Sequence, residues 1–165
     1  MKANPAITLA VATALALLAG CSAPRERQPE ARIIKVLPSL LDTEGRASLH
    51  PSLYERDAYQ ALLRAESKKV GGLRFDVLWK TPGNTTQSRP LVLKLELRGS
   101  AHGTNATAGN VIVVERPFPA SLRGRTWSRI VLGPEEFRSV GEVSAWRATL
   151  VRDQQALAST QSFLW

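Results

Sequence analysis

The sequence is poor in the residues that build covalent or metal-held frameworks. It contains one cysteine and two histidines in 165 residues. A single cysteine excludes any disulfide within the chain. A structural zinc site needs about four Cys or His ligands at characteristic spacings, and none are present. We therefore expect no metal and no cofactor, and a fold held together by its hydrophobic core.

Long apolar runs are also scarce. The most apolar stretch, residues 6–19, has 14 residues, whereas a membrane-spanning helix needs about 20. Met1 and Lys2 give a positive start before this stretch, and small residues follow it up to Cys21. This order is typical of a cleaved secretory signal peptide, which we predict over residues 1–20.

The residues that end this segment, Leu18-Ala19-Gly20-Cys21, resemble the lipobox of bacterial lipoproteins. The resemblance implies that the Cys21 sulfur receives a diacylglyceryl group, that the chain is cleaved before Cys21, and that the new amino group is acylated. Several acyl chains on one residue hold a membrane firmly, whereas one holds it only marginally. In this family an Asp after the cysteine usually signals retention at the inner membrane. Ser22 in that place implies a lipid anchor in the outer membrane, facing the periplasm.

Basic residues outnumber acidic ones in the mature chain. Removing Lys2 with the signal peptide leaves 21 basic and 14 acidic residues among 145, a net charge of +7. This excess favours contact with polyanions such as lipid headgroups, lipopolysaccharide or acidic polymers. Export argues against nucleic acid as a partner. The simpler interpretation is that basic residues, which are spread along the chain, decorate solvated surfaces.

Composition divides the mature chain into two parts. Residues 21–32 carry charges and two prolines but no bulky apolar side chain. They cannot offset the entropy of ordering, so we expect a flexible tether. Residues 33–165 are enough for a single domain. No sequence pattern specifies an oligomeric state.

Residues 53–67 carry the one strong helix signal. Ser52 and Glu55 match a capping box, and no glycine or proline follows before residue 67. The pattern predicts an amphipathic helix that lies on a sheet or closes one end of it. Membrane insertion is the weaker alternative, because acidic residues sit among the basic ones. The expected buried side carries Tyr54, Ala58, Ala61, Leu62 and Ala65, with Tyr59 and Leu63 adjacent to it. The opposite stripe carries Arg56, Asp57, Gln60 and Arg64.

After Gly72 the apolar residues recur at every second position, as in half-buried strands. Seven short strands are expected, separated by turn-rich loops, with a single helical turn near residues 135–137. This predicts a mainly β fold, an antiparallel two-sheet sandwich of immunoglobulin-like or fibronectin-like type with one amphipathic helix. A transthyretin-like sandwich or a small barrel is the alternative. The expected strands are 33–37 (an edge strand ended by Pro38), 73–80, 91–98, 111–114, 125–132, 144–152 and 156–164.

The tryptophans are the largest candidates for the core. Trp79, Trp127 and Trp146 lie within predicted strands, and we expect them to fill the space between the sheets. We expect Trp165, the last residue, to cap the core. An exposed Trp165 acting as a recognition signal is the alternative.

A cationic-aromatic strip is the candidate binding site. If residues 126–132 form a strand, Arg125 and Arg129 project from the same face as Trp127, and Arg123 lies just before them. Such a strip at a sheet edge could bind an anionic glycan or an envelope protein. The simpler interpretation is three solvated arginines beside a core tryptophan.

No motif specifies catalysis, so we name no catalytic residue. His50 and His102 lie in predicted loops, and neither a nucleophile elbow nor a phosphate-binding glycine loop is present. We expect a non-enzymatic binding or accessory module of the cell envelope. The alternatives are an assembly component of an outer-membrane or secretion machine, and an envelope hydrolase. A hydrolase would gather His50 or His102 with carboxylates in a concave site.

Overall fold

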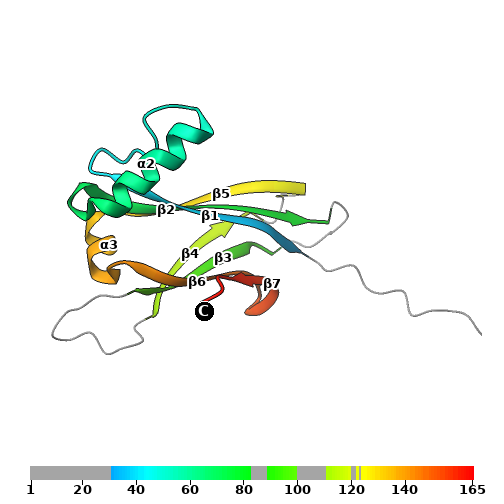
Figure 1. The fold of residues 1–165 in the computed structure, drawn as a ribbon. Coiled ribbons are helices and arrows are strands. Elements are labelled where there is room, and N and C mark those ends of the chain that lie inside the picture. The colour runs from blue at the N-terminus through cyan, green and yellow to red at the C-terminus, as the bar shows by residue number, and fades with distance from the viewer. Residues whose placement is uncertain (1–30, 83–88, 100–110, 120–121, 123) are drawn as a thin grey trace, which may run out of the picture.

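The described part of the chain is a two-layer β-sandwich (Figure 1). The computed structural model describes residues 31–82, 89–99, 111–119, 122 and 124–165. In these residues sheet A has the strand order β1-β2-β5 and sheet B has the order β4-β3-β6-β7. The strands are β1 (Arg32–Asp42), β2 (Val70–Thr81), β3 (Leu91–Gly99), β4 (Val111–Phe118), β5 (Gly124–Leu132), β6 (Val143–Arg152) and β7 (Gln155–Gln161).

This arrangement confirms the predicted antiparallel two-sheet sandwich of immunoglobulin-like or fibronectin-like type. The chain changes sheet between β2 and β3, between β4 and β5, and between β5 and β6. Strands that follow each other in sequence therefore often lie in opposite layers, as in Greek-key sandwiches. The strands form two open sheets rather than the single closed sheet of the barrel alternative. The helical elements are α2 (Leu53–Ala65), the 3-10 turn η1 (Ser67–Lys69) and α3 (Pro134–Val140).

The core lies between the sheets because one side of each central strand is apolar. On β2, Phe75, Val77 and Trp79 point inward and are fully buried. They meet inward side chains of the facing sheet, and each fully buried aliphatic or Phe side chain contributes roughly 1.5–3 kcal/mol. The other fully or nearly fully buried strand residues of this core are Leu73, Leu91, Leu93, Leu95, Leu97, Ile130, Leu132, Ala148 and Leu150.

The strand tryptophans do not share one environment. Trp79 is fully buried and its ring lies 5.5 Å from that of Phe118. Trp146 is half-buried and packs edge-on against Phe75 at 6.3 Å. Trp127, however, is 54% exposed, so its expected place in the core is wrong. The residues beside it on β5 face inward, and the alternation of a strand turns Trp127 outward.

Trp165 does not cap the core, contrary to expectation. Its ring lies under two guanidinium groups, 4.3 Å from Cζ of Arg98 and 4.6 Å from Cζ of Arg147. Both arginines belong to the outer face of sheet B, because Leu95 and Leu97 of β3 face inward. Cation–π attraction therefore places the C-terminal residue on the outside of the sandwich.

Strand β1 forms one edge of sheet A and continues past Pro38, where the prediction ended it. The backbone N–H and C=O of Leu40 bond to the Gln60 side chain of α2, at 2.8 and 2.9 Å, so they point to the free edge. Pro38 lies two residues earlier in the same phase, so its missing N–H removes no bond to β2. Gln60 also donates to the Ala47 carbonyl at 2.8 Å.

Helix α2 forms where residues 53–67 predicted it, but it packs with a different side than expected. Gln60 and Leu63 are buried, whereas Tyr54 is 83% exposed and Leu62 is 39% exposed. The amide side chain of Gln60 forms hydrogen bonds with the backbone N–H and C=O of Leu40 at the free edge of β1. Pairing these backbone groups outweighs burial of the alanine-rich side of the helix.

The first turn of α2 and the length of α3 also differ from the prediction. Ser52 occupies the N-cap position of α2, but its side chain makes no capping bond. Its backbone carbonyl accepts the Arg56 N–H at 3.0 Å. Helix α3, where a single turn was expected, is seven residues long, and Glu136 accepts the Gly133 N–H at 2.9 Å.

The two ends of the sandwich are built differently. Helix α3 packs against β2, β3 and β5 at one end, where α2 also lies on the outer side of sheet A. At the opposite end β1 begins, β2 ends and β5 begins (Figure 1). This helix-free end of sheet A carries the charge described next.

Candidate functional site: the outer face of sheet A

Strand β5 presents the predicted cationic-aromatic strip. Arg125, Trp127 and Arg129 alternate along β5 and are all exposed, while Ser128 and Ile130 between and beyond them are buried. Strand β5 is also an edge strand, paired on one side only, with β2. The structure therefore places these three residues on one exposed face at a sheet edge, and their role in binding stays a prediction. Arg123, the fourth residue of the predicted strip, lies outside the described residues.

The carboxylate of Asp76 pairs with two arginines in the middle of this face. Asp76 of β2 lies opposite Arg129 of β5, and Arg129 Nε donates to Asp76 Oδ1 at 3.0 Å. Arg74 Nε lies 2.9 Å from Asp76 Oδ2. The Asp76 carboxylate thus holds two guanidinium groups, while Arg129, whose side chain is 62% exposed, keeps its terminal N–H donors for other acceptors.

A row of three cations crosses the helix-free end of the sheet. Arg32 of β1 is the register partner of Lys80 on β2, and Lys80 is the register partner of Arg125 on β5. All three are exposed. We call them the cationic row. Among the described residues none of the three forms an ion pair.

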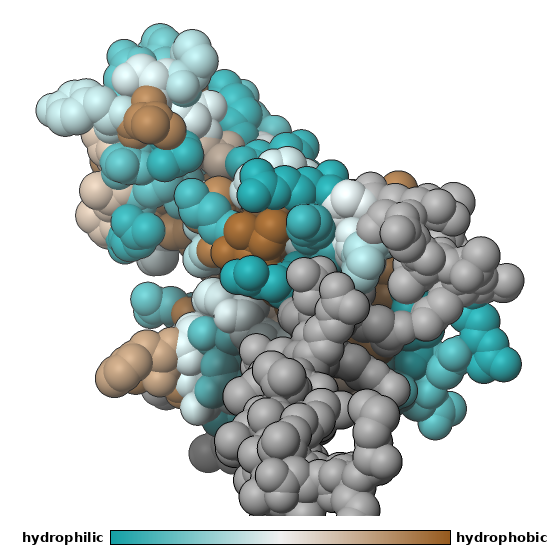
Figure 2. All heavy atoms as spheres, turned by 90° about the vertical axis from the view of Figure 1, so that its right-hand side faces the viewer, coloured by the Kyte–Doolittle hydropathy of each residue, from teal (hydrophilic) through white to brown (hydrophobic). Residues whose placement is uncertain are grey.

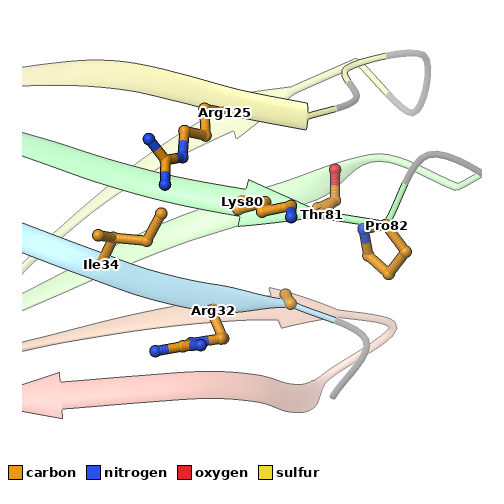
Figure 3. A pocket seen from close by; sticks show the side chains of 7 residues that line it. Arg32, Ile34, Lys80, Thr81, Pro82 and Arg125 are labelled. Carbon is orange, nitrogen blue, oxygen red and sulfur yellow. The ribbon is translucent and has the colours of Figure 1, made fainter. Parts of the chain in front are cut away.

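The cationic row lines a hollow of about 450 Å³. Ala31, Ile34, Thr81 and Pro82 supply the rest of its described lining. In Figure 3 the guanidinium groups of Arg32 and Arg125 extend toward the left of the view and the Lys80 amine toward the right, so the three charges do not converge on one point. Figure 2 views the same end of the molecule and shows hydrophilic side chains around a small hydrophobic area.

A second, smaller hollow lies where α2 approaches the same face. It measures about 270 Å³ and opens between β1, β2 and the side of α2 that carries Gln60. Its charged lining is mixed, with Arg56, Arg64 and Arg74 facing Asp57 and Asp76. Because acids and bases alternate there, it lacks the single-sign charge of the cationic row.

On the outer face of sheet B, unlike the cationic row of sheet A, the basic side chains have partners within the chain. Glu96 accepts a 2.7 Å hydrogen bond from Arg147, and Lys94 Nζ lies 3.3 Å from its other oxygen. The bond from Arg147 lowers the pKa of Glu96, against the effect of burial. Arg147 and Arg98 also stack on Trp165. The cations of this face are therefore committed to intramolecular partners.

The residues considered for catalysis or metal binding are not gathered into a site. His50 is exposed and lies in neither described hollow. His102 lies outside the described residues. Within the described parts of the chain no group of three or more His, Cys, Asp or Glu is close enough to hold a metal ion. Within the described residues, His50 therefore does not form the concave site with carboxylates that the hydrolase alternative requires.

Sequence reasoning found the strip but missed the cationic row. Arg32 was assigned to the tether, although β1 begins at that residue. Lys80 alternates with the buried Trp79, which marks it as outward-facing. Its alignment with Arg32 and Arg125 depends on strand pairing, for which the sequence carries no local signal. The predicted signal peptide and Cys21 lie outside the described residues.

Comparison with protein-family models, curated proteins and solved structures finds no match to this chain. No helix in the described ranges is long and apolar enough to cross a membrane.

Proposed function

We propose that this chain is a lipid-anchored protein of the bacterial cell envelope that acts as a non-enzymatic binding module. The sandwich is the binding domain, joined through residues 21–32 to lipid on Cys21 in the outer membrane. The outer face of sheet A takes an anionic glycan as its ligand. The observation that carries the proposal is the exposed alternation of Arg125, Trp127 and Arg129 on an edge strand.

Each residue of the strip has a role in this proposal. The exposed indole of Trp127 offers a flat apolar surface on which the C–H face of a sugar ring stacks. Arg125 and the outer donors of Arg129 bind the acidic groups of the same glycan, since guanidinium pairs with carboxylate or phosphate through two parallel hydrogen bonds. Asp76 fixes Arg129 in place and so lowers the entropy lost on binding.

The binding test uses the chain from Ser22 to Trp165, without lipid. Every strand of the structure begins at or after Arg32, so this chain retains both sheets. Isothermal titration calorimetry would compare an alginate oligosaccharide with a neutral dextran oligosaccharide of equal length. We expect binding of alginate only. In W127A/R129Q we expect at least about tenfold weaker binding, the usual cost of losing a central anchor residue.

A matched control removes the same side-chain types elsewhere. Tyr54 on α2 is 83% exposed and Arg138 on α3 is exposed, and neither lines a described hollow of sheet A. The variant Y54A/R138Q should therefore bind alginate like the unchanged chain. Equal loss in both variants, or equal binding of alginate and dextran, would contradict a specific glycan site on sheet A.

The anchor is tested separately by mass spectrometry of the protein from bacterial membranes. We expect a mature chain that begins at Cys21 and carries acyl chains. In C21S we expect the protein to leave the membrane fraction. An unmodified thiol on Cys21 would overturn the proposed anchoring but not the glycan binding.

A further inference from the structure

We infer that the cationic row, Arg32, Lys80 and Arg125, binds phosphate groups of anionic phospholipid headgroups in the membrane that holds the anchor. The inference rests on the lipid anchor proposed above. It adds a second function to sheet A: its helix-free end docks on the bilayer and orients the sandwich.

The first argument is the cost of the row without an anion. Like charges placed directly opposite on neighbouring strands destabilise a sheet. Here they occupy three adjacent strands in register. Residues 31–41, 77–95 and 116–134, which include this end of sheet A, contain no Asp or Glu in their sequence. No carboxylate of the described residues pairs with the row, so its charge is open to an external anion.

The second argument is the absence of such a surface elsewhere in the described chain. Arg74, Arg129 and Arg147 each have a carboxylate partner on their own face. The hollow near α2 is lined by charges of both signs. The cationic row thus combines three exposed positive charges with an open hollow of about 450 Å³.

The third argument is the length of the tether. Arg32 follows Cys21 by eleven residues, which span roughly 40 Å when fully extended and roughly 20 Å as a flexible coil. Lipid on Cys21 therefore keeps Arg32 close to the headgroups at a high effective concentration. Juxtamembrane Lys and Arg residues bind anionic bilayers in this way.

The orientation of the side chains favours several headgroups over one small anion. The charged groups of Arg32, Lys80 and Arg125 come from three strands and do not converge on one point of the hollow in Figure 3. A bilayer surface offers many phosphodiesters side by side, so each cation can meet its own. Ile34, which is 40% exposed and lines the same hollow, would lie at the interface between headgroups and water.

The test is co-sedimentation of the unlipidated chain from Ser22 to Trp165 with vesicles. One set is phosphatidylcholine alone, and the other is an equal mixture of phosphatidylcholine and phosphatidylglycerol. We expect binding to the mixture only, weakened by salt. In R32Q/K80Q we expect roughly thirtyfold weaker partitioning, since each basic residue near a surface contributes about 1 kcal/mol. This variant leaves the whole strip of β5 intact.

The matched control removes two exposed cations from the other end of the sandwich, in K68Q/R138Q. It has the same net charge as R32Q/K80Q, and we expect partitioning close to that of the unchanged chain. Circular dichroism of all variants would verify that each is folded. Equal weakening in both variants would reduce the effect to net charge and overturn the inference.

Two further measurements complete the test. The first distinguishes lipid phosphate from a soluble phosphate, and the second distinguishes membrane docking from glycan binding. Binding of glucose 6-phosphate in calorimetry, together with no binding to the phosphatidylglycerol vesicles, would assign the row to a soluble phosphate and overturn membrane docking. If W127A/R129Q loses alginate but keeps vesicle binding, the inference stands beside the glycan site. Alginate binding without vesicle binding would overturn the inference and leave the proposed glycan function.

Discussion

The indole N–H of Trp79 donates a 2.7 Å hydrogen bond to the hydroxyl of Ser128, and both residues are buried. The bond joins the central strand of sheet A to its edge strand β5. Because Ser128 is held inward, Trp127 and Arg129 on either side of it face outward. This buried hydrogen bond therefore helps to determine that Trp127 and Arg129 are on the outer face of β5.

Replacing Ser128 by alanine tests this contact. S128A leaves the Trp79 N–H buried without its partner, which costs about 1–3 kcal/mol. Urea unfolding followed by fluorescence should show this loss. S139A, at an exposed position of α3, should change the unfolding free energy by less than about 0.5 kcal/mol. Equal stability of S128A and the unchanged chain would contradict the role of the bond.

Stability at acidic pH should depend on Asp42. Burial by itself raises the pKa of this carboxyl, but hydrogen bonds from the Tyr59 hydroxyl and from Arg46 outweigh burial and lower the pKa from 3.8 to about 2. Since the folded pKa lies below the unfolded one, the carboxylate stabilises the fold above pH 3.8. This contribution is lost as the pH falls toward 2.

Y59F removes the 2.7 Å bond to Asp42 and so brings the pKa of Asp42 back toward its usual value. Denaturant midpoints of the unchanged chain and Y59F should therefore differ most at neutral pH and converge as the pH approaches 2. Y54F alters a tyrosine on the exposed side of the same helix and should match the unchanged chain at every pH. A constant gap between Y59F and the unchanged chain would exclude the linkage.

A side chain at Gly99 should disturb the helix-covered end of the sandwich. A Cβ on Gly99 would collide with the backbone oxygen of Val140, the last residue of α3. G99A should cost about 1–3 kcal/mol through overpacking, seen as a lower midpoint in thermal unfolding. Gly133 has nothing within 4 Å of a built Cβ, so G133A should be tolerated much better.

Gln60 should control the attachment of α2 to sheet A. Q60A removes the partners of the Leu40 N–H, the Leu40 carbonyl and the Ala47 carbonyl. We expect a loss of about 1–3 kcal/mol and faster hydrogen exchange at the Leu40 amide. E55A, at an exposed position of the same helix, should leave that amide protected. Unchanged exchange in Q60A would show that α2 is held by other contacts.

Much of the fold was predictable because strand periodicity is a local property. Leu73, Phe75, Val77 and Trp79 alternate with polar or outward residues, and the structure buries this whole series. The same alternation carried a signal for Trp127 that the prediction of its burial overlooked. Ile130 and Leu132 lie at even-numbered positions and face inward. Trp127 lies at an odd-numbered position, so the alternation of the strand already placed it on the outer face.

The packing side of α2 was not predictable from the helix alone. Its alanine-rich side is the more apolar, yet Gln60 and Leu63 face the sheet. The reason lies outside the helix, in the unpaired backbone groups of Leu40 on the edge of β1. Helix amphipathicity predicts a buried side only when the surface it meets is apolar.

By itself the sequence determined the mainly β character, the positions of most strands and one helix, the lack of an internal disulfide, and the excess of positive charge. It also predicts the signal peptide and the lipid on Cys21. Only the tertiary structure decided which strands are neighbours, and hence that residues 32, 80 and 125 form one row. Alternation along a strand is encoded within a few residues, whereas register is set by hydrogen bonds and packing between distant parts of the chain.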